Sequence, residues 1–188
     1  MQRLTGLLIG AVFGAVFVFV NSHPPLDPTI ALVLRVAASA TLGGVLLLWF
    51  TAVRRARTTG VEPVVAGGRA GGKMFGLGFA VIAVAEVVML FGGIAVLRAL
   101  DRPVETNVAW IALVVGLHFV ALGPVWKNRT IMLPGLVLTV LGAAGLAMTF
   151  TPALEWVPLV SGVLSGVTLL AGCTASSWSA LSAPAATR

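Results

Sequence analysis

Long runs of apolar residues alternate with short polar breaks along the whole chain. A helix needs about 17–25 predominantly apolar residues to cross the hydrocarbon core of a bilayer. Runs of this kind occur at six places, namely 4–20, 30–53, 74–97, 108–126, 131–150 and 157–178. The pattern predicts an all-α membrane protein in which residues 1–188 form a single bundle of six transmembrane helices.

Proline and polar residues occupy the breaks between the apolar runs. Pro24 and Pro25 follow the first run, Pro103 separates the third from the fourth, and Pro152 precedes the sixth. Proline cannot continue a helix that comes before it, so these positions predict helix ends. The first run resembles a secretory signal peptide, but it is long and no A-x-A-like site follows. We therefore expect an uncleaved anchor.

Composition supports lipid as the solvent of this chain. Hydrophobic residues make up 59% and charged residues 10% of the sequence, with a mean hydropathy of +1.06. Soluble domains carry about 25% charged residues, so the excess of apolar residues is too large for a globular core. The net charge of +6 comes mainly from residues between the apolar runs. This arrangement is typical of membrane topology and does not indicate a nucleic-acid partner.

The basic residues also predict an orientation. With six spans, the side that holds the amino terminus receives Arg3, Arg54, Arg55, Arg57, Arg69, Lys73, Lys127, Arg129 and Arg188. The opposite side receives only Arg98 and Arg102, diluted by Asp101 and Glu105. Cytoplasmic loops carry the excess of Lys and Arg, so both termini are expected in the cytoplasm.

Two segments are expected outside the spans. Residues 54–73 form a basic, glycine-rich cytoplasmic loop, suited to a flexible connector near anionic headgroups, and residues 179–188 form a short carboxy-terminal tail. Cys173 is the only cysteine, which rules out an intrachain disulfide. The sequence predicts no metal site and no cofactor.

Glycines at four-residue spacing mark two helix faces. The first span carries Gly6, Gly10 and Gly14, and the sixth carries Gly162 and Gly166. Such faces let helix backbones approach closely in lipid. Packing within one bundle is the favoured interpretation, and an oligomer formed through either face is the alternative.

Three ionisable residues fall inside predicted spans: Arg35, Glu86 and His118. Charge at the bilayer centre costs at least about 2.5–3.5 kcal/mol, so each residue needs a partner or water. Glu86 lies about 16 Å and His118 about 15 Å from the same membrane surface, at about 1.5 Å of rise per residue. Their two helices share a short loop. We therefore predict that Glu86 and His118 meet near the midplane and form a candidate catalytic acid–base pair.

Four other residues are candidates for binding a substrate. Arg35 either snorkels to the interface or pairs with Glu86 from above. Trp110 belongs to a set of tryptophans near span ends, which is typical of the aromatic belt at the headgroups. Glu155 and Trp156 lie at the outer interface, where they would border the mouth of a pocket.

The segment Val115-Gly116-Leu117-His118-Phe119-Val120-Ala121-Leu122 carries a resemblance. It is similar to a segment of small bacterial six-helix membrane proteins, in which a Gly-Leu-His-Phe run precedes a Pro-Leu-Ala-like step and a short basic turn. Ala121 stands where proline is usual in that group, and Lys127-Asn128-Arg129 supplies the turn. The resemblance covers little more than the fourth span. It implies a multi-pass protein of the bacterial cytoplasmic membrane and supplies no activity.

Three classes of function fit these observations. The first is an enzyme of isomerase or cyclase type, or a binding protein, for a lipophilic small molecule that enters from the bilayer. The second is a proton-coupled transporter or small-ion channel, because Glu and His chains relay protons in such proteins. The third is a non-catalytic membrane subunit in which the pair holds the helices in register.

Overall fold

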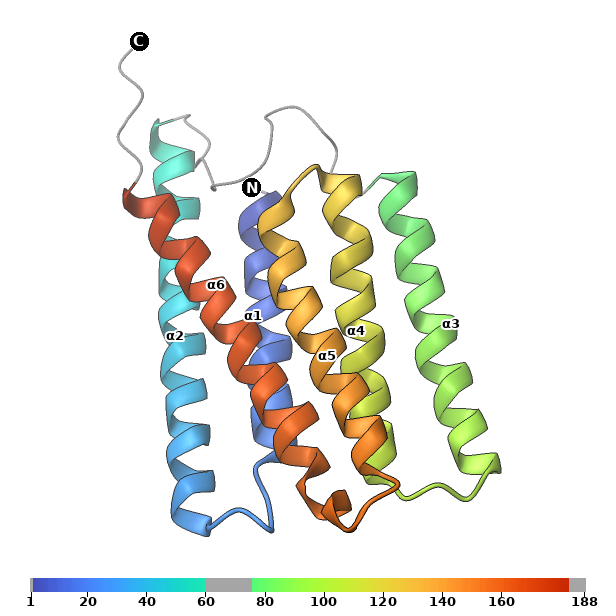
Figure 1. Cartoon of the computed structure of the whole chain (residues 1–188). Helices are drawn as coiled ribbons and strands as arrows, with labels where there is room; N and C mark the ends of the chain where they lie inside the picture. The colour runs from blue at the N-terminus through green and yellow to red at the C-terminus, as the bar shows by residue number, and fades with distance from the viewer. Residues whose placement is uncertain (1, 60–75, 183–188) are drawn as a thin grey trace.

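A computed structural model gives the architecture of the protein (Figure 1). It describes residues 2–59 and 76–182, with side chains over 6–54 and 76–177. Residues 60–73 of the predicted cytoplasmic loop, residues 74–75 of the predicted third span, most of the predicted tail and the side chain of Trp178 lie outside the described residues. The α-helices in the described part are α1 (Gln2–Asn21), α2 (Pro28–Thr59), α3 (Leu77–Ala99), α4 (Glu105–Trp126), α5 (Met132–Met148) and α6 (Leu164–Ser182).

The all-α prediction with six helices is confirmed within the described residues. Five helical segments are long and apolar enough to cross a membrane: Pro28–Arg54, Leu77–Ala99, Glu105–Trp126, Arg129–Met148 and Pro152–Ser177. The first helix contributes a shorter apolar stretch, Gly6–Asn21. The sequence pattern therefore located the helices, while their bounds shift by several residues because turns and caps set the ends.

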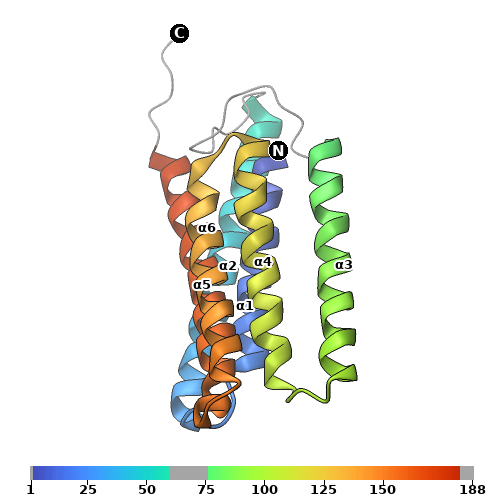
Figure 2. The ribbon, with the colours of Figure 1, turned by 45° about the vertical axis from the view of Figure 1, so that its right-hand side comes forward.

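The helices run alternately up and down, so that α1 begins and α6 ends at the same end of the bundle (Figure 1). We call the opposite end, where α1 ends and α2 begins, the distal end. The most extensive helix contact joins α4 and α5, followed by α1 with α6. α2 and α3 stand at opposite edges of the bundle, and Figure 2 shows α3 beside α4 and apart from the other helices.

Glycines allow the central helices to approach backbone to backbone. A Cβ added to Gly14 would lie 2.9 Å from the carbonyl oxygen of Gly166, and one added to Gly166 would lie 2.5 Å from that of Gly14. Gly10 and Gly162 are also crowded, by Cys173 and Asn21 respectively. Gly10, Gly14 and Gly166 thus serve the α1–α6 contact, and Gly162 serves the contact of α1 with the segment Pro158–Val163 just before α6. The interpretation of packing within one bundle predicts such contacts.

The chain enters α6 through irregular turns. A 3-10 helix (Pro152–Trp156) occupies the predicted break before the sixth span, and a π-helix (Pro158–Val163) forms the start of the span predicted at 157–178. Pro158 stands in the first turn of the π-helix, where the missing backbone N–H breaks no helical hydrogen bond. The π-helix turns Ser161 towards α5, where its hydroxyl donates to the carbonyl of Leu141 at 2.9 Å.

Candidate intramembrane acid–base site

Helix α3 meets the bundle along one narrow seam. Partly buried residues recur along it at alternating spacings of four and three: Phe79, Ala83, Glu86, Leu90, Gly93 and Leu97. This is the spacing with which one helix packs along another in a coiled coil. No residue of α3 is fully buried. The residues outside the seam are mostly exposed and apolar, so the remaining surface of α3 faces lipid.

Glu86 and His118 meet in the middle of this seam, as the depth argument predicted. The Nδ1 atom of His118 lies 3.0 Å from Oε2 of Glu86. The angles are not those of a hydrogen bond, so Nδ1 has no hydrogen-bond partner even though the two groups are within reach. A modest rotation of the imidazole would align the proton donor with its acceptor.

Both side chains remain partly accessible. The exposed fraction is 12% for His118 and 22% for Glu86. Among the described helices, α3 makes its substantial contacts with α4 alone, so the pair lies near the edge of the bundle (Figure 2). The residues on either side of Glu86 in the sequence, Ala85 and Val87, are exposed and apolar.

Aromatic rings surround the imidazole. The rings of Phe79 and His118 meet edge to face with centroids 6.5 Å apart, and those of Phe119 and His118 do so at 5.7 Å. Phe79 also stacks on Trp126 at 6.1 Å. The sequence argument missed Phe79, although its distance of seven residues from Glu86 places it on the same helix face, two turns away. The rings make the surroundings of the pair apolar and limit its access to water.

Trp110 of α4 contacts α3 in the part of the seam between Glu86 and the end of α3. Its Nε1 donates to the carbonyl oxygen of Met89 in α3 at 3.0 Å. The indole lies against Gly93, where a Cβ would collide with three ring atoms. In the structure Trp110 therefore makes a helix-to-helix contact, and neither a headgroup contact nor a ligand contact is needed to explain its position.

Arg35 lies away from the pair. It belongs to α2, at the opposite edge of the bundle from α3 (Figure 1). Its Nη2 donates to the carbonyl oxygen of Ser22, just beyond the end of α1, at 2.6 Å. The contact with Glu86 that we considered is absent from the structure. The side chain instead bonds to the buried residue Ser22.

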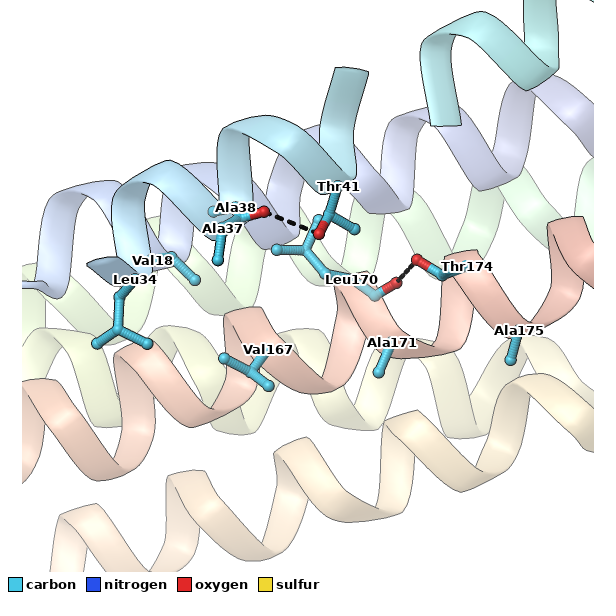
Figure 3. Close-up of a pocket in the computed structure, with 10 residues that line it drawn as sticks. All are labelled: Val18, Leu34, Ala37, Ala38, Thr41, Val167, Leu170, Ala171, Thr174 and Ala175. Carbon is cyan, nitrogen blue, oxygen red and sulfur yellow. Dashed lines mark hydrogen bonds between the residues drawn. The ribbon is translucent and has the colours of Figure 1, made fainter. Parts of the chain in front are cut away.

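Glu155 and Trp156 lie at the distal end, in the turn before α6, and both are exposed. The structure shows no contact between them and the Glu86–His118 pair among the described residues. A groove is present elsewhere, between α1, α2 and α6 (Figure 3), and neither Glu86 nor His118 lines it. Of the predicted site residues, the structure thus brings together Glu86 and His118, with Trp110 further along the same seam.

The described residues contain no group of three or more His, Cys, Asp or Glu side chains that could hold a metal ion. The chemistry of the described site therefore rests on one carboxyl group and one imidazole. These two groups can exchange a proton with each other or with a molecule placed between them.

No protein-family model, curated protein or solved structure matches this chain. Its class follows from the helices themselves. The protein is a multi-pass helical membrane protein with a carboxylate–imidazole pair between α3 and α4.

Proposed function

We propose that Glu86 and His118 form an acid–base site for a lipophilic small molecule that reaches it sideways from the bilayer. The observation that carries the proposal is the 3.0 Å approach of the two groups on a seam that leaves both partly exposed. Ionisable residues within a membrane span are costly and are commonly retained for function. Apolar residues at these two positions would hold α3 against α4 without that cost.

We further propose that the protein crosses the membrane six times, with both termini in the cytoplasm. The uneven distribution of Lys and Arg supports this orientation. The shared end of α1 and α6 supports the even number of crossings (Figure 1). The resemblance of the segment around His118 adds the bacterial cytoplasmic membrane as the location.

The chemistry that suits this pair is proton transfer at carbon, as in the isomerisation of a double bond. One group removes a proton from an allylic carbon while the other returns a proton to the far end of the double bond. The double bond moves, and the molecule neither gains nor loses atoms or electrons. Such a reaction needs a placed acid, a placed base and an apolar site.

Proton transport is the second hypothesis, and the seam supports it less well. A relay needs further titratable groups that lead from the pair to each surface. The other described seam positions of α3 carry Phe, Ala, Leu and Gly. The remaining charged residues of the described segment 77–126 are Arg98, Asp101, Arg102 and Glu105, which cluster at the distal loop.

Deuterium exchange tests the proposed chemistry. The purified protein would be placed in nanodiscs containing a total lipid extract of its host and incubated in D₂O. Proton transfer at carbon would introduce deuterium into one lipophilic compound, detected by mass spectrometry. We expect Glu86→Gln and His118→Ala each to lower the exchange rate at least about 100-fold, the usual contribution of a general acid or base.

His23→Ala and Glu155→Gln are the matched controls, because these residues carry the same groups outside the seam. Both controls should exchange at the wild-type rate. If no compound in the extract gains deuterium above a protein-free sample, the proposed chemistry is wrong. Equal rates in the wild type and in both seam variants would exclude Glu86 and His118 as the reacting groups.

A further inference from the structure

An apolar groove lies between α1, α2 and α6, on the other side of the bundle from the acid–base pair (Figure 3). Its volume is about 720 Å³, within the range of about 300–1,000 Å³ that holds small-molecule ligands. Val18 of α1 contributes to its lining, together with Leu34 and Ala37 of α2 and Val167 and Ala171 of α6. The small alanine side chains leave the space that larger residues would fill.

The groove offers no free polar group to a ligand along its length. Thr41 and Thr174 are the hydroxyl residues in its lining. Each hydroxyl donates to a carbonyl of its own helix at 2.8 Å, Thr41 to Ala37 and Thr174 to Leu170 (Figure 3). Their methyl groups complete an aliphatic wall. From Leu34 to Thr41 the groove follows α2 for about 10 Å. The shape and chemistry therefore suit a hydrocarbon chain that lies parallel to the helices.

The positively charged side chain of Arg35 lies near the distal end of the contact between α1 and α2. Arg35 shares the face of α2 that carries Ala31, Ala38 and Val45, and the last two pack with α1. Its guanidinium reaches Ser22, whose hydroxyl and N–H both bond to the carbonyl of Val18. Ser22 lies about one helical turn beyond the lining residue Val18, and the guanidinium bonds to the carbonyl of Ser22. Arg35 is also the direct neighbour in sequence of the lining residue Leu34.

The charge of Arg35 is only partly satisfied within the described residues. It donates to one neutral carbonyl, and its buried Nε has no hydrogen-bond partner. No described carboxylate pairs with it. Arginine favours phosphate because its planar N–H groups fit the phosphate oxygens. Basic sites between transmembrane helices bind anionic lipid headgroups in the same way.

We propose that this groove binds one acyl chain of an anionic phospholipid from the leaflet at the distal end, with the headgroup phosphate held by Arg35. The acyl chain lies against the aliphatic lining of the groove. The phosphate accepts hydrogen bonds from guanidinium N–H groups of Arg35 that do not bond to the Ser22 carbonyl. The site is independent of the acid–base pair, because Glu86 and His118 lie outside the groove.

Native mass spectrometry of the full-length protein tests the site. The protein in detergent would be titrated with a phosphatidylglycerol and, separately, with a diacylglycerol that carries the same acyl chains but no phosphate. We expect the anionic lipid to bind about tenfold more tightly, as expected for one hydrogen bond between charged groups. Arg35→Gln should remove this preference and leave the weaker chain-dependent binding of both lipids.

Ala171→Phe fills the groove from an exposed position on α6 and should weaken both lipids about tenfold or more. Ala40→Phe is the control, because Ala40 is exposed on α2 and lies outside the groove; it should bind both lipids as the wild type does. Equal affinities of the wild type for the two lipids would overturn the proposal, as would wild-type binding by Ala171→Phe. If Arg35→Gln does not fold, the lipid comparison in the wild type and in Ala171→Phe still decides.

Discussion

Replacing Gly93 with alanine tests whether the close approach of α3 to α4 is needed to hold the site together. A Cβ at this position would lie within the indole of Trp110, whose position is fixed by its bond to the carbonyl of Met89. Gly92, the preceding residue of the same helix, has no atom within 4 Å of an added Cβ. The two substitutions add the same methyl group, one against a ring and the other towards lipid.

The expected difference in the free energy of unfolding follows from two effects. Forcing a methyl group into a packed contact costs about 1–3 kcal/mol. Loss of the Trp110–Met89 hydrogen bond costs a further 0.5–1.5 kcal/mol or so. The gain in helix propensity from glycine to alanine, about 1 kcal/mol, is common to both variants and cancels. Gly93→Ala should therefore be less stable than Gly92→Ala by about 2–4 kcal/mol.

Unfolding with sodium dodecyl sulfate in mixed micelles measures this difference. A second measurement follows the site itself, because Glu86 lies two turns, about 10 Å, along α3 from Gly93. If α3 moves outward, a lipophilic carbodiimide should label Glu86 faster in Gly93→Ala than in Gly92→Ala. Equal stabilities and equal labelling rates would refute the reasoning, since they would mean that Trp110 moves aside at no cost.

Two further predictions concern other parts of the bundle. Gly166→Ala should lower the free energy of unfolding by about 1–3 kcal/mol, because the added Cβ meets the backbone of Gly14, whereas Gly43→Ala, which has open space, should leave it unchanged or raise it slightly. The N–H of Thr29 donates to the Asp27 carboxylate at 2.8 Å and holds the pKa of Asp27 below its ordinary value of 3.8. This stabilisation should be complete above about pH 4 and lost as the pH falls through the lower pKa of the folded state, so melting temperatures at about pH 6 and about pH 3 should differ less in Asp27→Asn.

The helices could be predicted from the sequence because their signal is local. About 20 apolar residues and a proline or polar break define a span without reference to its neighbours. The arrangement of the helices could not be predicted in the same way. Residues that face lipid and residues that face another helix are both apolar, so the sequence of α3 does not reveal that the helix has one substantial neighbour.

The candidate site was predictable for a related reason. Polar residues are rare in the spans, so counting residues from a shared loop was enough to bring Glu86 and His118 together. Arg35 shows the limit of that argument. Its depth agreed with a position above Glu86, but depth gives no information on the position of a helix around the bundle, and α2 lies at the opposite edge.

The positions of these ionisable residues follow from the packing of the centre. The contact of α1 with α6 and that of α4 with α5 depend on glycines at which even a Cβ would meet backbone atoms of the facing helix. Such contacts have no room for a carboxylate, an imidazole or a guanidinium. Ionisable side chains fit only where the outer helices α2 and α3 pack less closely, and there they also border the lipid. The looser packing that makes room for Arg35, Glu86 and His118 therefore leaves each of them only partly buried.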